Sequence, residues 1–214
     1  MYKIEFYENQ HGESEVWDFL EALRVKSKSS KDARIQYNQI LFYIDLLAKN
    51  GTNLPVNITK HLEEDIWELR PGNNRVFYFY YDESQYVLLH HFRKKITENT
   101  EPGNRPCQNG TRRLHPPKGG RTMRTWEDYK NHVKAVSEEE RRNMEEIEEV
   151  SDIVSSIIRR RQELGISQRA LAERCGIPQS SVARIETLKT TPKLDTLVKL
   201  MQALDLKLQV AAAG

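Results

Sequence analysis

The fold of the C-terminal part of this chain is decided by residues 158–186, IRRRQELGISQRALAERCGIPQSSVARIE. Ser167 is suited to cap a helix whose small and apolar residues let a second helix cross it closely. Gly176 supplies the left-handed conformation that a sharp turn needs. A second helix with a polar front follows, and its buried positions are Val182 and Ile185. The stretch therefore predicts a helix-turn-helix within an all-α domain.

Over residues 153–206 the chain resembles the Xre/Cro-like repressors, which include the HigA-type antitoxins. The resemblance implies an all-α domain over residues 153–214 that binds operator DNA as a homodimer, with its second helix in the major groove. Leu188 departs from the pattern, because many relatives have glycine at the turn after that helix. The DNA-contacting residues that the resemblance implies are Gln168, Gln179, Ser180, Ser181, Arg184 and Lys189.

Two features of this domain have a purely structural alternative. The hydroxyls of Ser180 and Ser181 could serve only to cap the second helix. The basic run at residues 159–161 is interpreted as a solvated helix face rather than a DNA contact.

The charge of the chain is unevenly distributed. The net charge is +2 overall, yet residues 123–152 carry −5 and residues 153–214 carry +5. An acidic arm followed by a basic domain predicts contact with a cationic surface and then with an anion.

The two cysteines lie in unrelated segments, so we expect no disulfide framework, no metal and no cofactor. No apolar run is long enough for a membrane span and no signal peptide is evident, which favours a cytoplasmic protein.

The N-terminal part shows both helical and strand periodicity. Residues 13–25 and 31–49 have the apolar spacing of helices, whereas residues 3–8, 66–70, 75–81 and 86–92 read as strands. Turn-forming residues separate the last three strands. Residues 1–96 are therefore predicted to form an α+β domain, with two helices packed on one face of a mainly antiparallel sheet.

Cationic side chains lie on or beside these strands, with histidines and aromatic rings among them. Such a mixture suits the backbone and bases of a nucleic acid, although Lys and Arg also flank strands as solubilising edges. Their spacing over residues 2–95 resembles the RelE/HigB toxin superfamily, in its phage-derived Gp49-like branch. The resemblance implies a ribosome-dependent endonuclease that cleaves mRNA in the A site. The catalytic residues that it implies are Arg70, Arg75, His91, Arg93, Lys94 and Lys60.

The resemblance also assigns roles. Arg70 and Arg75 would neutralise the phosphorane formed when the ribose 2′-hydroxyl attacks the adjacent phosphate. Arg93 or Lys94 would assist the leaving oxygen. Lys60, His90 or His91 would move the proton, and His91 is favoured because it shares a strand face with Arg93. Glu68 is expected to be a structural partner of an arginine.

Residues 97–122 join the two halves. They have no apolar period and are rich in proline and glycine, so they are predicted to be a disordered linker. The codons of residues 118–120 can resemble a ribosome-binding site ahead of Met123. We therefore hypothesise that a frameshift near residue 96 fused two adjacent genes. After the linker, residues 123–152 form the acidic helical arm, with helices at 126–136 and 138–149 and a capping box from Ser137 to Glu140.

The two resemblances together favour a toxin–antitoxin pair in one chain. An mRNA endoribonuclease would be masked or impaired by an antitoxin that contacts it in cis or in trans and represses its own operon. Its partners would be operator DNA and mRNA in the ribosomal A site, with no membrane involved. The alternative is a non-enzymatic helix-turn-helix regulator with an inactive RelE-like partner domain.

Overall fold

A computed structural model describes residues 1–82, 84–94 and 123–209 of the chain. The predicted linker, residues 97–122, lies outside the described residues. Within the described ranges, no helix is both long and apolar enough to cross a membrane.

The N-terminal domain has the predicted α+β architecture. Its five-stranded sheet runs in the order β1-β5-β4-β3-β2, with β1 parallel to β5 and the other pairs antiparallel. The prediction missed β2, whose side chains after Thr59 are exposed and give no strand periodicity. The elements are β1 (Lys3–Phe6), α1 (Glu15–Ser27), α2 (Lys31–Asn50), β2 (Thr59–Glu63), β3 (Ile66–Leu69), β4 (Asn74–Asp82) and β5 (Gln85–Arg93).

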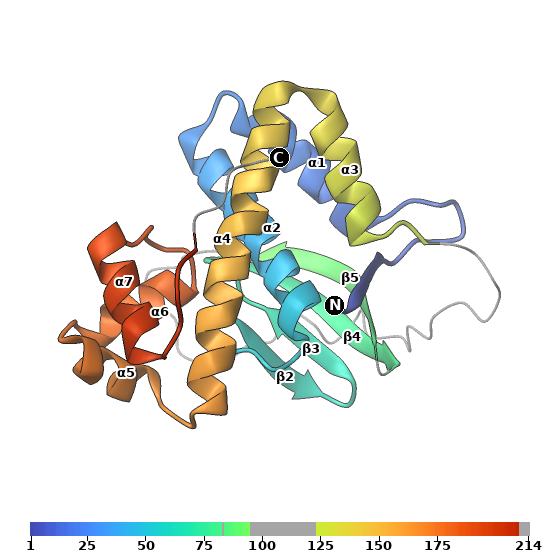
Figure 1. Cartoon of the computed structure of the whole chain (residues 1–214). Coiled ribbons are helices and arrows are strands. Elements are labelled where there is room, and N and C mark those ends of the chain that lie inside the picture. Colours follow the sequence, from blue (N-terminus) through green and yellow to red (C-terminus); the bar gives the residue numbers. More distant parts are fainter. Residues whose placement is uncertain (83, 95–122, 210–214) are drawn as a thin grey trace, which may run out of the picture.

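Helix α2 is the central element of the molecule. From Ile40 to Ala48 each residue is buried, because the helix lies between the sheet and the long helix α4 (Glu138–Glu163). A helix that is apolar on nearly all sides requires neighbours on nearly all sides. Figure 1 shows α4 running across α2, with the sheet on the other side of α2.

The arm joins this core instead of lying on its surface. Helix α3 (Trp126–Val136) has the predicted bounds, and Trp126 and Tyr129 are buried in the same cluster as the core of the sheet. Helix α4 is longer than predicted: it continues through the expected arm boundary at residue 152 to Glu163. The arm and the helix-turn-helix domain therefore share one continuous helix.

The C-terminal domain has a second core, in which α4 contributes Ile157 and α6 contributes Val182. Gly176 is left-handed, as predicted, and so is Leu188, with φ of +50°. Residues 206–210 alternate in polarity as a short strand would, but residues 206–209 form none, and residue 210 lies outside the described part. The short helices are α5 (Gln168–Cys175), α6 (Gln179–Glu186) and α7 (Leu194–Ala203).

Candidate functional site

The two arginines predicted to bind the scissile phosphate lie beside Glu68. Arg75 is buried; its Nε lies 2.5 Å from Oε1 of Glu68, and its Nη1 donates to the carbonyls of Gly72 and Asn74. Burial lowers the pKa of Arg75 from its usual value, the carboxylate of Glu68 opposes this shift, and the charge of Arg70 adds to it. The side chain of Arg70 is 30% exposed and lies 3.8 Å from the same oxygen. Glu68 is thus the arginine partner that the sequence predicted.

Strand pairing decides which other predicted residues share the sheet face of Arg75. Lys60 pairs with Glu68, Glu68 pairs with Phe77, and Phe77 pairs with His90. Residues paired across a ladder point to the same face. Arg75 lies two residues before Phe77 in β4 and so shares its face. Lys60 and His90 therefore belong to the face of Arg75, and both are exposed.

His91, the histidine favoured from the sequence, lies on the other face. It pairs with Val76 of the core, and its ring stacks on Phe19 of α1 with centroids 3.5 Å apart. Its Nδ1 lies 3.3 Å from Glu15, and burial lowers its pKa. The structure therefore brings His90, and not His91, to the face of Arg75. Parity along the strand gave the relative orientation correctly but did not reveal which face the helices cover.

Arg93 and Lys94 lie at the end of β5 and are exposed. Arg93 pairs with Asn74 across the ladder, and the backbone N–H of Lys94 donates to the carbonyl of Asn73 at 2.9 Å. Both residues are next to the turn before Arg75, but neither lines the pocket that holds Arg70 and Arg75.

The predicted recognition helix α6 presents polar side chains outward. Gln179, Ser180 and Arg184 are exposed, and Lys189 is exposed just beyond the end of the helix. Pro178 occupies the N-cap without a side-chain hydrogen bond, so the capping alternative for Ser180 and Ser181 is wrong. Val182 and Ile185 are buried on the opposite side of the helix, as predicted.

A buried ion pair links the helix-turn-helix to α4. Arg161 is 7% exposed, and its Nε donates to Oε1 of the fully buried Glu186 at 2.8 Å. The interpretation of residues 159–161 as a solvated face is therefore wrong for Arg161. Glu186 also accepts the side-chain amide of Gln168 at 2.6 Å. That amide, predicted to contact a phosphate, is used within the domain.

One face of α6 lies against the N-terminal domain and lines the same pocket as Arg70 and Arg75. Ser180, Ala183, Arg184 and Thr187 follow the spacing of a single helical stripe and line one side of a pocket of about 340 Å³. The pocket also contains Lys189, and its other side is lined by residues of the N-terminal domain: Tyr43, Asn57, Arg70, Gly72 and Arg75. The carbonyl of Thr187 accepts a hydrogen bond from Gln39 at 3.3 Å. No sequence signal predicted this juxtaposition, because it depends on how the domains dock.

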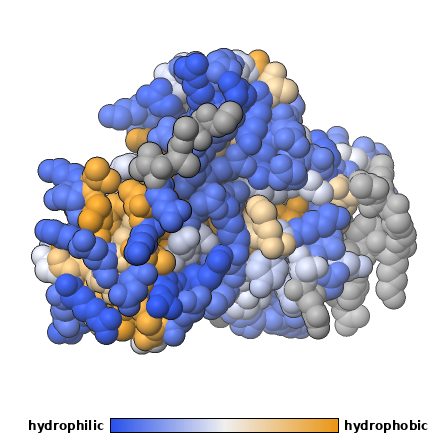
Figure 2. All heavy atoms as spheres, viewed as in Figure 1, coloured by the Kyte–Doolittle hydropathy of each residue, from blue (hydrophilic) through white to orange (hydrophobic). Residues whose placement is uncertain are grey.

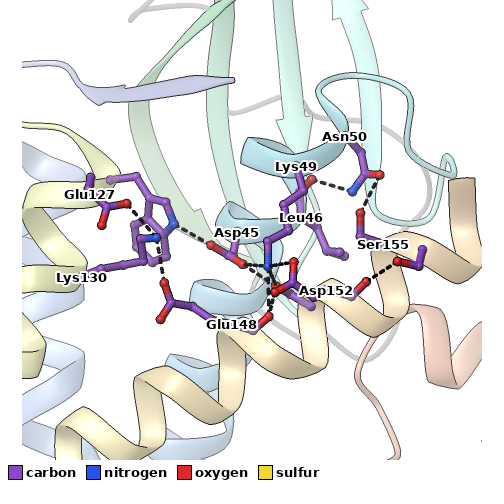
Figure 3. A network of polar contacts seen from close by, with 12 residues as sticks. Asp45, Leu46, Lys49, Asn50, Glu127, Lys130, Glu148, Asp152 and Ser155 are labelled. Carbon is purple, nitrogen blue, oxygen red and sulfur yellow. Dashed lines mark hydrogen bonds and ion pairs between the residues drawn. The ribbon is translucent and has the colours of Figure 1, made fainter. Parts of the chain in front are cut away.

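A buried polar network fixes the arm to α2 (Figure 3). Asp45 is fully buried and accepts a hydrogen bond from Nε1 of Trp126 at 3.0 Å. Lys49 lies 2.8 Å from Asp45 and 2.7 Å from Asp152 of α4. The hydroxyl of Ser151 bonds to Asp45 and accepts from Lys49 at 2.6 Å. A buried carboxylate needs such partners, so Asp45 of the N-terminal domain depends on the arm for part of its hydrogen bonds.

The outer part of the same interface pairs opposite charges. Glu140 lies 2.8 Å from Arg24 and 2.9 Å from Lys28, both at the end of α1. The predicted capping box is therefore only half formed: Ser137 caps α4 by accepting from the backbone of Glu140, while the Glu140 carboxylate turns to α1. The acidic arm contacts a cationic surface, as the charge pattern predicted.

Comparison with known proteins assigns both halves of the chain. Residues 157–210 match the family model "Helix-turn-helix", and residues 20–104 match "Phage derived protein Gp49-like (DUF891)". An "Uncharacterized HTH-type transcriptional regulator" of Haemophilus influenzae is 41% identical over 71 residues, which are 32% of this chain and 72% of that protein. A solved structure titled "Toxin-Antitoxin module from Streptococcus pneumoniae" is 35% identical, with a TM-score of 0.36, over 44% of this chain and 97% of that one. The predicted order, a Gp49-like domain and then a helix-turn-helix domain, is confirmed.

Proposed function

Because the chain belongs, through its C-terminal part, to the HTH-type transcriptional regulators and carries a Gp49-like domain ahead of it, we propose that it is a HigB–HigA-type toxin–antitoxin module in one polypeptide. The N-terminal domain is a ribosome-dependent mRNA endonuclease of the cytoplasm. The C-terminal domain binds the operator of its own genes. In the folded chain the antitoxin half masks the toxin half.

The observation that carries this proposal is the pocket in which α6 faces Arg70 and Arg75. Two guanidinium groups on one side of a sheet suit the dianionic phosphorane of a 2′-hydroxyl attack, because forked donors match phosphate oxygens. His90 is the histidine on that face, and its Nδ1 lies 2.7 Å from Glu15, a carboxylate that can orient the ring. We therefore propose His90 in place of His91 for proton transfer. Lys60, Arg93 and Lys94 remain proposed as phosphate or leaving-group contacts.

For the operator we propose contacts from Gln179, Ser180, Ser181, Arg184 and Lys189, with the backbone at Gln168 near a phosphate.

A homodimer would form through α7. Leu194 and Val198, one turn apart on that helix, are 66% and 37% exposed. Figure 2 shows hydrophobic surface on the side of the molecule where α7 lies. Light scattering of the full chain tests this: a dimer that Leu194→Glu converts to monomer supports it, and a monomeric parent chain contradicts it.

A second function is favoured by one observation. Arg75 is held by Glu68 and by two carbonyl groups, as an arginine with a purely structural role would be. In this case the N-terminal domain is a non-enzymatic partner module of a helix-turn-helix regulator.

Mapping of mRNA ends in a translating extract separates the two functions. Residues 1–96 are added alone, and beside them the Arg70→Ala variant and the full chain. The toxin function predicts cuts at codon positions with residues 1–96, few with the variant and few with the full chain. Uncut mRNA from a 1–96 fragment that still binds residues 123–214 contradicts it.

A further inference from the structure

The pocket between α6 and the N-terminal domain has an excess of positive charge. Arg70 and Arg75 enter it from one side, and Arg184 and Lys189 from the other. Glu68 lies within ion-pair distance of the first two. Within residues 1–82, 84–94 and 123–209, no carboxylate forms an ion pair with Arg184 or Lys189. Four cations thus share one pocket, and among the described residues one carboxylate, Glu68, forms ion pairs with them.

An anion that enters the pocket would offset the repulsion between these cations. Like charges repel more strongly where protein replaces part of the water, and Arg75, which is buried, cannot turn away into solvent. The exposed guanidinium group of Arg184 can donate to two phosphate oxygens, whereas Arg75 has only Nη2 left to donate beside its contacts with Glu68 and two carbonyl groups. The hydroxyl of Ser180 adds a donor from the first turn of α6. The volume of about 340 Å³ is near the lower end of the range for small-molecule sites, on the order of 300–1,000 Å³, and is too small for a duplex.

We propose that this pocket binds the phosphate group of a small nucleotide and that the ligand bridges the two domains. Arg70 and Arg75 hold it from the toxin side, and Arg184 and Lys189 hold it from the recognition helix. Because Arg184 and Lys189 are also the proposed operator contacts, a chain that holds the nucleotide has both side chains occupied. This competition rests on the proposed function, whereas phosphate binding does not.

Calorimetric titration of the full chain with adenosine 3′-monophosphate tests the proposal, with adenosine and inorganic phosphate as separate arms. We expect the nucleotide to bind and adenosine not to bind. Arg184→Gln and Lys189→Gln each remove an exposed side chain, so the fold is retained, and each should weaken binding roughly tenfold. Arg159→Gln, on the exposed side of α4, is the matched control and should leave binding unchanged.

Absence of binding, equal binding of adenosine, or full affinity in the Arg184→Gln variant overturns the proposal. Binding of inorganic phosphate with exclusion of the nucleotide overturns the assignment to a nucleotide. The titration measures neither RNA cleavage nor operator binding, so its failure is distinct from a failure of the proposed function. Saturating nucleotide should also release the chain from its own promoter DNA, and DNA retained by the loaded chain overturns the competition.

Discussion

Trp126→Phe should destabilise the whole molecule, because Trp126 donates one of the two hydrogen bonds that the arm gives to the fully buried Asp45, the other coming from Ser151. Phenylalanine keeps an aromatic ring beside Tyr129, whose centroid is 5.7 Å away, but it has no donor. A buried charged acceptor that loses a partner costs about 1.5–3 kcal/mol, and the smaller ring adds about 1 kcal/mol of lost burial. The free energy of unfolding should therefore fall by about 2.5–4 kcal/mol.

Urea denaturation of the full chain measures this change. With a slope of about 2 kcal/mol per molar urea, the midpoint should fall by about 1–2 M while the slope stays the same. Trp67→Phe is the matched control. It makes the same substitution in strand β3, where Trp67 packs beside His61 and no described carboxylate accepts a hydrogen bond from its ring. Trp126→Phe should cost clearly more than the control. Equal costs would mean that the hydrogen bond from the arm to the buried carboxylate contributes nothing to stability.

Three further changes test other parts of the account. Arg161→Met leaves Glu186 buried without its guanidinium and should cost the helix-turn-helix domain about 3 kcal/mol; an unchanged melting temperature contradicts this. The pKa of His91 is lowered in the folded chain, so the unfolded chain binds more protons below about pH 6.5 and stability falls as the pH drops. His91→Phe should flatten that slope in urea midpoints measured from pH 7.5 to pH 5. Leu188→Gly relieves a left-handed residue but removes its packing on the core of the N-terminal domain. It should stabilise the 123–214 fragment and destabilise the full chain, and effects of the same sign contradict this.

The features that could be predicted from the sequence are those that depend on the pattern of neighbouring residues. The α+β class, the two helix-turn-helix helices, the turn at Gly176 and the bounds of α3 follow from apolar spacing, capping and glycine conformation. Strand β2 was missed because an exposed edge strand has no buried face to impose alternation. The orientation of His91 was missed because strand parity relates side chains to each other, not to the helices that cover one face.

The remaining differences come from contacts between residues distant in the chain. Arg161 lies in a basic run that reads as solvated, and its burial becomes visible only when Glu186 is placed beside it. The pocket shared by Arg70 and Arg184 requires the docking of two separately recognisable domains. Each half was assigned by its own motifs, whereas the contact between them is a property of the folded chain.

Growth of cells that express residues 1–96, with and without residues 123–214 supplied as a separate chain, tests whether the chain joins a toxin to its own antitoxin. We expect arrest by residues 1–96, rescue by residues 123–214, and weaker rescue when the supplied chain carries Trp126→Phe. The full chain should allow normal growth. Normal growth with a soluble 1–96 fragment that binds residues 123–214 would contradict the account and leave a DNA-binding regulator with an inactive partner domain.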